Sequence, residues 1–197
     1  MKNKEKILEL LKNNNGYVTS SMVKNEGIDL KFLSNMVKDK QLTRISRGTY
    51  RSYDDFPDVF YEHLSKSKYA RYSHTTALYF HNYSMRTPIH FDITIKSGYG
   101  GALQKEKNIS LFYVKKSFID LGLIEVLSPF GMPIKIYDLE RTICDIVRDK
   151  NKIDPEIFTE AIKQYARHKP KNMAKLLDYA KKLKIERKLR DYLEVLV

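Results

Sequence analysis

Three helix-like segments followed directly by a short basic ribbon occupy the first 51 residues, and this order most constrains the fold. Apolar residues at the spacing of one helical face predict helices over residues 2–13, 19–26 and 29–40. The third segment has the clearest apolar stripe, formed by Phe32, Leu33, Met36 and Val37. The ribbon, residues 42–51, is expected to turn at Gly48, because glycine accepts the positive φ that a tight hairpin needs. A small helical core with a β-hairpin beside it is therefore expected.

This succession is typical of a winged helix-turn-helix, a fold that lays one helix in the major groove of duplex DNA. The polar face of residues 29–40 combines short polar groups, which can bond to base edges, with lysines, which can pair with phosphates. From this face we predict DNA contacts by Lys31, Ser34, Asn35 and Lys38. An ordinary solvated helix face is the alternative, and the ribbon that follows makes it the weaker interpretation.

The ribbon is expected to anchor itself inward through Ile45 and Tyr50. Its three arginines, Arg44, Arg47 and Arg51, are then expected to point outward, toward the DNA backbone or the minor groove. A surface hairpin with solubilising arginines is the alternative. The absence of any acidic residue in this stretch favours contact with DNA.

Positive charge gathers at both ends of a chain whose net charge is +12. Residues 1–52 hold 11 Lys and Arg against 5 Asp and Glu, and residues 163–190 hold 11 against 2. Such a balance favours a polyanionic partner. The second segment predicts another basic surface, for flanking DNA or a different anionic partner, with a solubilising face as the alternative. Its predicted members are Lys163, Arg167, Lys181, Lys182, Lys184, Arg187 and Lys188.

A break in composition at residues 53–58 predicts a boundary between a DNA-binding domain, residues 1–52, and a second domain, residues 59–197. The second domain is expected to be mixed, with a small β-sheet and a basic helical tail, so the fold class is α+β. The expected strands cover residues 90–96, 109–114, 124–127 and 134–137. The expected helices cover residues 59–66, 73–81, 138–149, 155–168, 172–183 and 186–196.

The chain lacks the usual signals of several other protein classes. No apolar run approaches the roughly 18 residues of a membrane span, and the first residues lack a signal-peptide core, so a cytoplasmic protein with no membrane contact is expected. The one cysteine, Cys144, leaves no internal disulfide. The histidine spacing fits no metal motif, so no metal, cofactor or catalytic residue is predicted. Glu140, Arg141 and Asp145 are interpreted as ion pairs that hold the fold.

Three segments together resemble AbiEi-family antitoxins of type IV toxin–antitoxin systems, which act in abortive infection against phage. They are residues 44–50 (Arg-Ile-Ser-Arg-Gly-Thr-Tyr), 72–78 (Tyr-Ser-His-Thr-Thr-Ala-Leu) and 136–146 (Ile-Tyr-Asp-Leu-Glu-Arg-Thr-Ile-Cys-Asp-Ile). The resemblance implies a repressor that binds inverted repeats in its own operator through the N-terminal domain. It also implies that the C-terminal domain counters a nucleotidyltransferase toxin, AbiEii, with or without direct contact. The basic segment 163–190 could then meet the toxin or its nucleic-acid substrate.

Two alternatives stay open at this point. One is a nucleic-acid-processing enzyme, which would need clustered carboxylates around Asp92, Glu140 and Asp145. The other is a transcription factor without a toxin partner. A reading helix of this length covers a few base pairs, so pairing of the protein on repeated half-sites is expected in any DNA-binding case.

Overall fold

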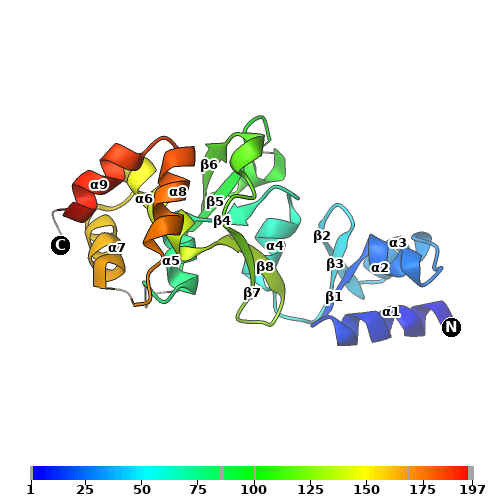
Figure 1. Cartoon of the computed structure of the whole chain (residues 1–197). Helices are drawn as coiled ribbons and strands as arrows, with labels where there is room; N and C mark the ends of the chain where they lie inside the picture. Colours follow the sequence, from blue (N-terminus) through cyan, green and yellow to red (C-terminus); the bar gives the residue numbers. More distant parts are fainter. Residues whose placement is uncertain (1, 85–86, 100, 168, 195–197) are drawn as a thin grey trace. The chain divides into compact units, whose positions relative to one another are not determined.

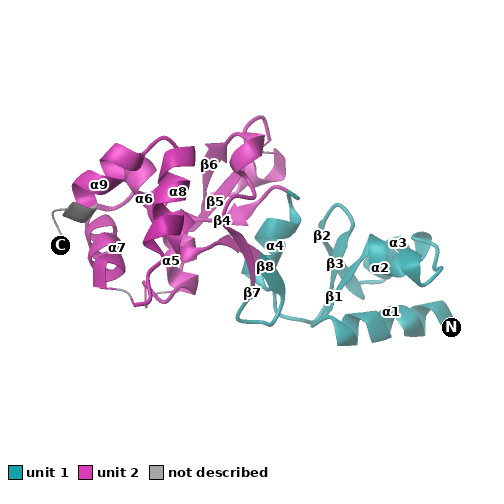
Figure 2. Cartoon of the chain, in the orientation of Figure 1, with its two compact units in different colours: residues 1–68, 126–134 teal, residues 69–125, 135–197 magenta. Residues whose placement is uncertain are grey.

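The computed structural model describes residues 2–84, 87–99, 101–167 and 169–194 (Figure 1). The ends of two predicted helices, at His168 and Leu196, lie outside these residues. The fold class is α+β, as the sequence predicts. Two compact units divide the chain: unit 1 is residues 1–68 with 126–134, and unit 2 is residues 69–125 with 135–197 (Figure 2). The predicted domain division around residues 53–58 stays a prediction.

Unit 1 consists of helices around a small antiparallel sheet. Its helices are α1 (Lys2–Asn13), α2 (Ser20–Asn25), α3 (Lys31–Lys38) and α4 (Val59–Ser65). Its strands are β1 (Tyr17–Thr19), β2 (Leu42–Ser46) and β3 (Thr49–Ser52), in the order β1-β3-β2. β2 and β3 form the hairpin that the basic ribbon predicts. The core under them is made by Ile7, Leu11, Val18, Val23, Ile28, Leu33, Met36, Leu42 and Tyr50.

Two local features of unit 1 refine the sequence-based expectations. The Thr19 hydroxyl accepts a hydrogen bond from the Met22 amide at 3.2 Å and so caps α2. Helix α3 begins at Lys31, two residues later than expected, because Asp29 accepts the Lys31 amide at 2.8 Å in a turn that precedes the helix. The helix-turn-helix order is unchanged by this shift.

Residues 126–134 belong to unit 1 although they are distant in sequence from its other residues. The Ser128 hydroxyl donates a hydrogen bond to Asp58 Oδ2, while Asp58 Oδ1 accepts the amides of Phe60 and Tyr61 at the start of α4. Asp58 and Ser128 are both buried. The N-terminus of α4 therefore depends on a hydroxyl group supplied from about 70 residues further along the chain.

Unit 2 combines a mixed sheet with a helical tail. The helices are α5 (His74–Phe80), α6 (Leu139–Arg148), α7 (Pro155–Arg167), α8 (Met173–Lys182) and α9 (Glu186–Glu194). Short 3₁₀ turns lie at η1 (Gly101–Lys105), η2 (Lys116–Phe118) and η3 (Lys150–Lys152). The strands are β4 (Arg71–Tyr72), β5 (Phe91–Lys96), β6 (Ile109–Val114), β7 (Leu123–Leu127) and β8 (Pro133–Tyr137), in the order β6-β5-β4-β8-β7. Residues 126–127 of β7 and 133–134 of β8 are counted with unit 1. β5 and β6 run parallel, with Phe91 opposite Ile109. Helices α6 to α9 share one apolar core.

A buried ionic network holds α6 in place. Arg141 Nε lies 3.0 Å from Asp145 Oδ2, and both side chains are fully buried. Arg148 Nη1 lies 2.7 Å from the other Asp145 oxygen, and Arg148 also binds Asp149. His74 Nε2 is 3.2 Å from Asp149 Oδ2. Buried charges need such partners because burial without them is costly. The interpretation of Arg141 and Asp145 as structural ion pairs is confirmed.

Within the part of the chain that the structure describes, none of the helices has the length and apolar character needed to cross a membrane.

Candidate nucleic-acid interface

Helix α3 separates an apolar face from a polar one. Leu33 and Met36 are buried in the core of unit 1, and Val37 is partly buried. The expected apolar stripe is incomplete, because Phe32 remains 37% exposed. The four predicted contact residues, Lys31, Ser34, Asn35 and Lys38, are all exposed. Helix α3 itself contains no acidic residue, so this face is cationic.

None of these four side chains has a hydrogen bond or an ion pair with another residue in the described ranges. Their polar groups are therefore available to an external partner. The predicted set omits Lys40, which is also exposed and lies two residues after the end of α3, beyond Asp39. Its place between a helix and a basic hairpin is the sequence signal that could have identified it.

The hairpin presents two of its three arginines to solvent. Arg44 and Arg47 are exposed, whereas Tyr50 is buried as expected and Ile45 is half-buried. The turn itself is fixed, because Gly48 has φ +83° and its carbonyl accepts the Ser20 amide at 2.8 Å. The tip of the hairpin is thus attached to the start of α2, the first helix of the helix-turn-helix.

Arg51 differs from the expectation that it points outward. Its Nε donates to Glu62 Oε1 of α4 at 2.9 Å, Nη1 donates to the Asp55 carbonyl, and its side chain is 12% exposed. The Tyr17 hydroxyl donates to the same Glu62 oxygen at 3.0 Å. Arg51 therefore joins β3 to α4 inside unit 1. The hairpin offers Arg44 and Arg47 to a partner, and Arg51 has a structural role instead.

The predicted second basic surface separates into distinct groups. Lys182 and Lys184 line a pocket of about 400 Å³ together with Lys115 and Arg148. Lys163 instead borders a different pocket, of about 410 Å³, between α7 and α9. Arg167, Lys181 and Arg187 are exposed, while Lys188 is half-buried and donates to the Arg148 carbonyl at 3.3 Å.

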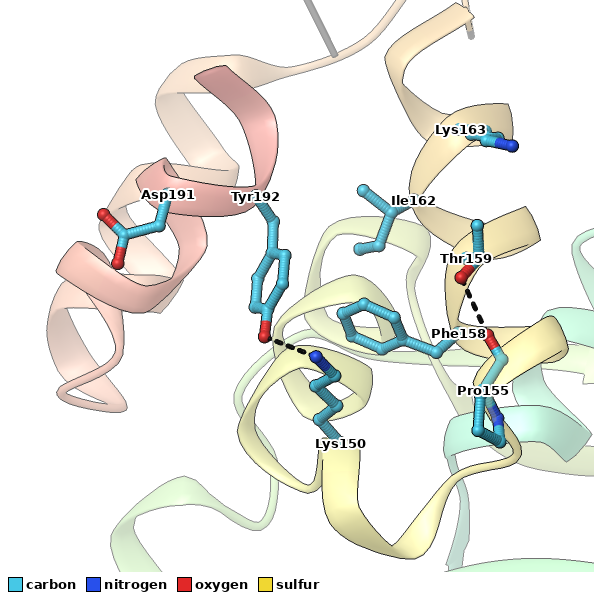
Figure 3. Close-up of a pocket in the computed structure, with 8 residues that line it drawn as sticks. All are labelled: Lys150, Pro155, Phe158, Thr159, Ile162, Lys163, Asp191 and Tyr192. Atoms are coloured by element: carbon cyan, nitrogen blue, oxygen red, sulfur yellow. Dashed lines mark hydrogen bonds between the residues drawn. The ribbon is translucent and has the colours of Figure 1, made fainter. Parts of the chain in front are cut away.

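The pocket between α7 and α9 is mainly apolar. Phe158 and Ile162 face Tyr192 across it, and Lys150 Nζ donates to the Tyr192 hydroxyl at 2.9 Å (Figure 3). The Lys163 side chain extends away from Tyr192 in this view. The Lys150 ammonium also lies over the Phe158 ring, 5.1 Å from its centre. The Lys150 ammonium is therefore already in contact with residues that line the pocket.

The carboxylates that an enzyme would need are held by separate partners. Asp92 accepts hydrogen bonds from the amide and the hydroxyl of Thr75, Glu140 lies 3.4 Å from Lys175, and Asp145 binds two arginines. Among the described residues, no group of three or more His, Cys, Asp or Glu side chains could hold a metal ion. Each of these three carboxylates therefore has its own partner within the fold.

Asp149 and Cys144 show how strongly burial acts in unit 2. Burial alone would raise the pKa of Asp149, but the His74 hydrogen bond and the Arg148 charge outweigh it and lower the pKa to about 2. Burial raises the pKa of the Cys144 thiol well above its ordinary value, with Asp145 adding to the shift. A buried thiol of this kind is unsuited to nucleophilic chemistry.

Comparison with known proteins supports the N-terminal geometry. The crystal structure of the RV2827C protein from Mycobacterium tuberculosis is similar, with a TM-score of 0.65 and 10% sequence identity over 98% of this chain and 77% of that one. At this identity the likeness shows a shared fold. A comparison with curated proteins found no match. The family model described as "Transcriptional regulator, AbiEi antitoxin" matches residues 5–53, which contain α3 and the hairpin. The resemblance to AbiEi antitoxins is thereby confirmed over residues 5–53, which include the segment 44–50, whereas the segments 72–78 and 136–146 lie outside the match.

Proposed function

We propose that this chain is a repressor and antitoxin that binds operator DNA through α3 and the β2–β3 hairpin. One observation carries the proposal. The polar face of α3 and Arg47 present cations and an amide without side-chain partners among the described residues, and the exposed Arg44 donates only to the Ser46 carbonyl, at 3.5 Å. The opposite face of α3 packs into the core. In this arrangement Asn35 reads base edges, and Arg44 and Arg47 contact the backbone or minor groove.

The finer features of the proposal follow from the AbiEi resemblance. The protein is expected to act in the cytoplasm, in a type IV phage-defence system, by binding rather than by catalysis. Unit 2 would then counter a nucleotidyltransferase toxin of the AbiEii type. Inverted repeats in the operator would engage two copies of the chain, because one α3 spans a few base pairs. A nucleotidyltransferase gene directly downstream would separate this function from that of a transcription factor without a toxin.

Two substitutions test the DNA-binding part. Asn35→Ala should relax base preference, since it removes an amide that can bond to adenine edges. Arg47→Ala should weaken binding to all sequences alike, since it removes a backbone or groove cation. Fluorescence anisotropy with the upstream region and with shuffled DNA measures both effects, and Lys12→Ala on the exposed side of α1 serves as the control. Unchanged affinity and unchanged specificity in both variants would rule out this interface.

A further inference from the structure

A second pocket in unit 2 differs from the apolar one in its charge. Its lining residues come from the end of β6, the turn η2, the end of α6 and the α8–α9 turn. Its volume of about 400 Å³ is within the range of small-ligand sites. The lining residues are Tyr113, Val114, Lys115, Ser117, Phe118, Arg148, Lys182, Leu183 and Lys184. Four of them are cations and none is acidic, so the pocket favours an anion.

Two of the four cations at this pocket are held in ion pairs, and two have none within the described part of the chain. Lys182 Nζ lies 2.7 Å from Asp178 Oδ2. Arg148 is held by Asp145 and Asp149, and its side chain is 21% exposed. Lys115 and Lys184 are exposed and form no side-chain hydrogen bond or ion pair with any residue for which the structure gives a position. These two ammonium groups, one at the start of η2 and one between α8 and α9, are therefore free to bind a phosphate.

Aromatic side chains stand beside the cations. Tyr113 on the edge strand β6 is 48% exposed, and Phe118 of η2 is partly buried. The face of an exposed aromatic ring accepts a nucleobase by stacking, independently of the base sequence. The Ser117 hydroxyl, also exposed, adds a donor next to Lys115. A phosphate and an aromatic base together match this set of groups better than a phosphate alone.

We infer that this pocket binds a nucleotide, either free or as part of a single strand. Its phosphate would contact Lys115 and Lys184, and its base would stack on Tyr113. The inference goes beyond DNA recognition by unit 1 and uses none of the residues of that interface. It also gives Lys184 of the basic tail a specific role.

The test is calorimetric titration of the full chain with ATP, inorganic tripolyphosphate and a single-stranded oligouridine. Lys115→Gln with Lys184→Gln should weaken nucleotide binding about tenfold or more, since both lysines neutralise phosphate charge. Lys105→Gln with Lys107→Gln removes the same charge from exposed positions outside the pocket and should leave the affinity nearly unchanged. Tyr113→Leu should weaken ATP and oligouridine binding but leave tripolyphosphate binding as it was.

The titrations distinguish a free nucleotide from a single strand, and they also show whether the inference is wrong. Tight binding of oligouridine that ATP does not displace assigns the site to a strand, whereas displacement by ATP assigns it to a free nucleotide. The variant Lys31→Gln with Arg47→Gln should retain this binding, so failure of the DNA interface would not affect the result. No saturable binding by the wild type, or equal losses in the two double-lysine variants, would overturn the inference. So would tripolyphosphate binding as tight as that of both ATP and oligouridine.

Discussion

The guanidinium of Arg51 lies 2.9 Å from the carboxylate of Glu62, and this pair joins β3 to α4. Both side chains are largely buried, at 12% and 17% exposure. The same Glu62 oxygen accepts the Tyr17 hydroxyl, so three elements of unit 1 meet at one carboxylate. Arg51, which the sequence predicts to contact DNA, is thus paired with a carboxylate inside unit 1.

This pair predicts different effects for two arginines of one hairpin. Arg51→Gln should lower the stability of unit 1 by about 1–2 kcal/mol, because it leaves Glu62 without its charged partner. Arg47→Gln should leave the melting temperature unchanged and weaken DNA binding instead. Thermal denaturation and anisotropy of both variants give the comparison. A stable Arg51→Gln variant with weakened DNA binding would return Arg51 to the interface.

The exposed cations of unit 1 predict a salt dependence. Each phosphate neutralised in duplex DNA adds roughly 0.9 to the slope of log affinity against log salt. Replacing both Arg44 and Arg47 by Gln should therefore flatten the slope by nearly two. Titrations at several salt concentrations measure it, with Lys12→Gln and Lys24→Gln as exposed controls of equal charge. An identical slope in the hairpin variant and the wild type would show that neither arginine meets a phosphate.

The Arg141–Asp145 pair predicts a large loss of stability. Asp145→Asn leaves two arginines without their shared carboxylate, one of them fully buried, and should cost about 3–5 kcal/mol. Urea unfolding of the full chain measures this loss. The matched control is Asp178→Asn, which breaks the exposed pair with Lys182 and should change stability by less than about 0.5 kcal/mol. Similar losses of stability in both variants would contradict the prediction that a buried ion pair matters more to stability than an exposed one.

Asp149 predicts a specific response to acid. Its pKa falls from 3.8 to about 2 on folding, so the ionised form is favoured in the folded state. The resulting stability, roughly 2 kcal/mol, is complete above about pH 4 and disappears as the pH falls toward 2. The stability difference between wild type and Asp149→Asn should therefore shrink over that interval. Urea unfolding at stepwise lower pH provides the measurement, and a constant difference would contradict the assignment.

Local patterns in the sequence predict the helices and most strands, because period and caps are properties of neighbouring residues. Thr19 is identified as a cap, and the hairpin turn at Gly48 follows from the sequence. The sequence does not reveal β1, since residues 17–19 become a strand by pairing with residues 49–51. A three-residue apolar segment has no period from which its partner could be inferred.

The candidate site is predictable where exposure follows helix geometry, as at Ser34 and Asn35. It is not predictable where a partner distant in sequence determines whether a side chain is exposed. The sequence does not show, for example, that Glu62 approaches Arg51. The same reason hides the cationic pocket, since Lys115 and Lys184 are far apart in sequence. Charge counting finds the basic tail but does not distribute its lysines among separate surfaces.

The contribution of Ser128 to the α4 cap has a practical consequence for anyone dividing this protein. A gene fragment that stops at residue 68 would encode the four N-terminal helices. In it, Asp58 Oδ2 would lose the hydrogen bond that it now accepts from the Ser128 hydroxyl. Chimaeras that exchange unit 1 between proteins of this fold need three crossover points instead of one, after residue 68 and on either side of residues 126–134. Residues 126–134 have to be transferred together with residues 1–68 if the transplanted unit is to keep its native packing.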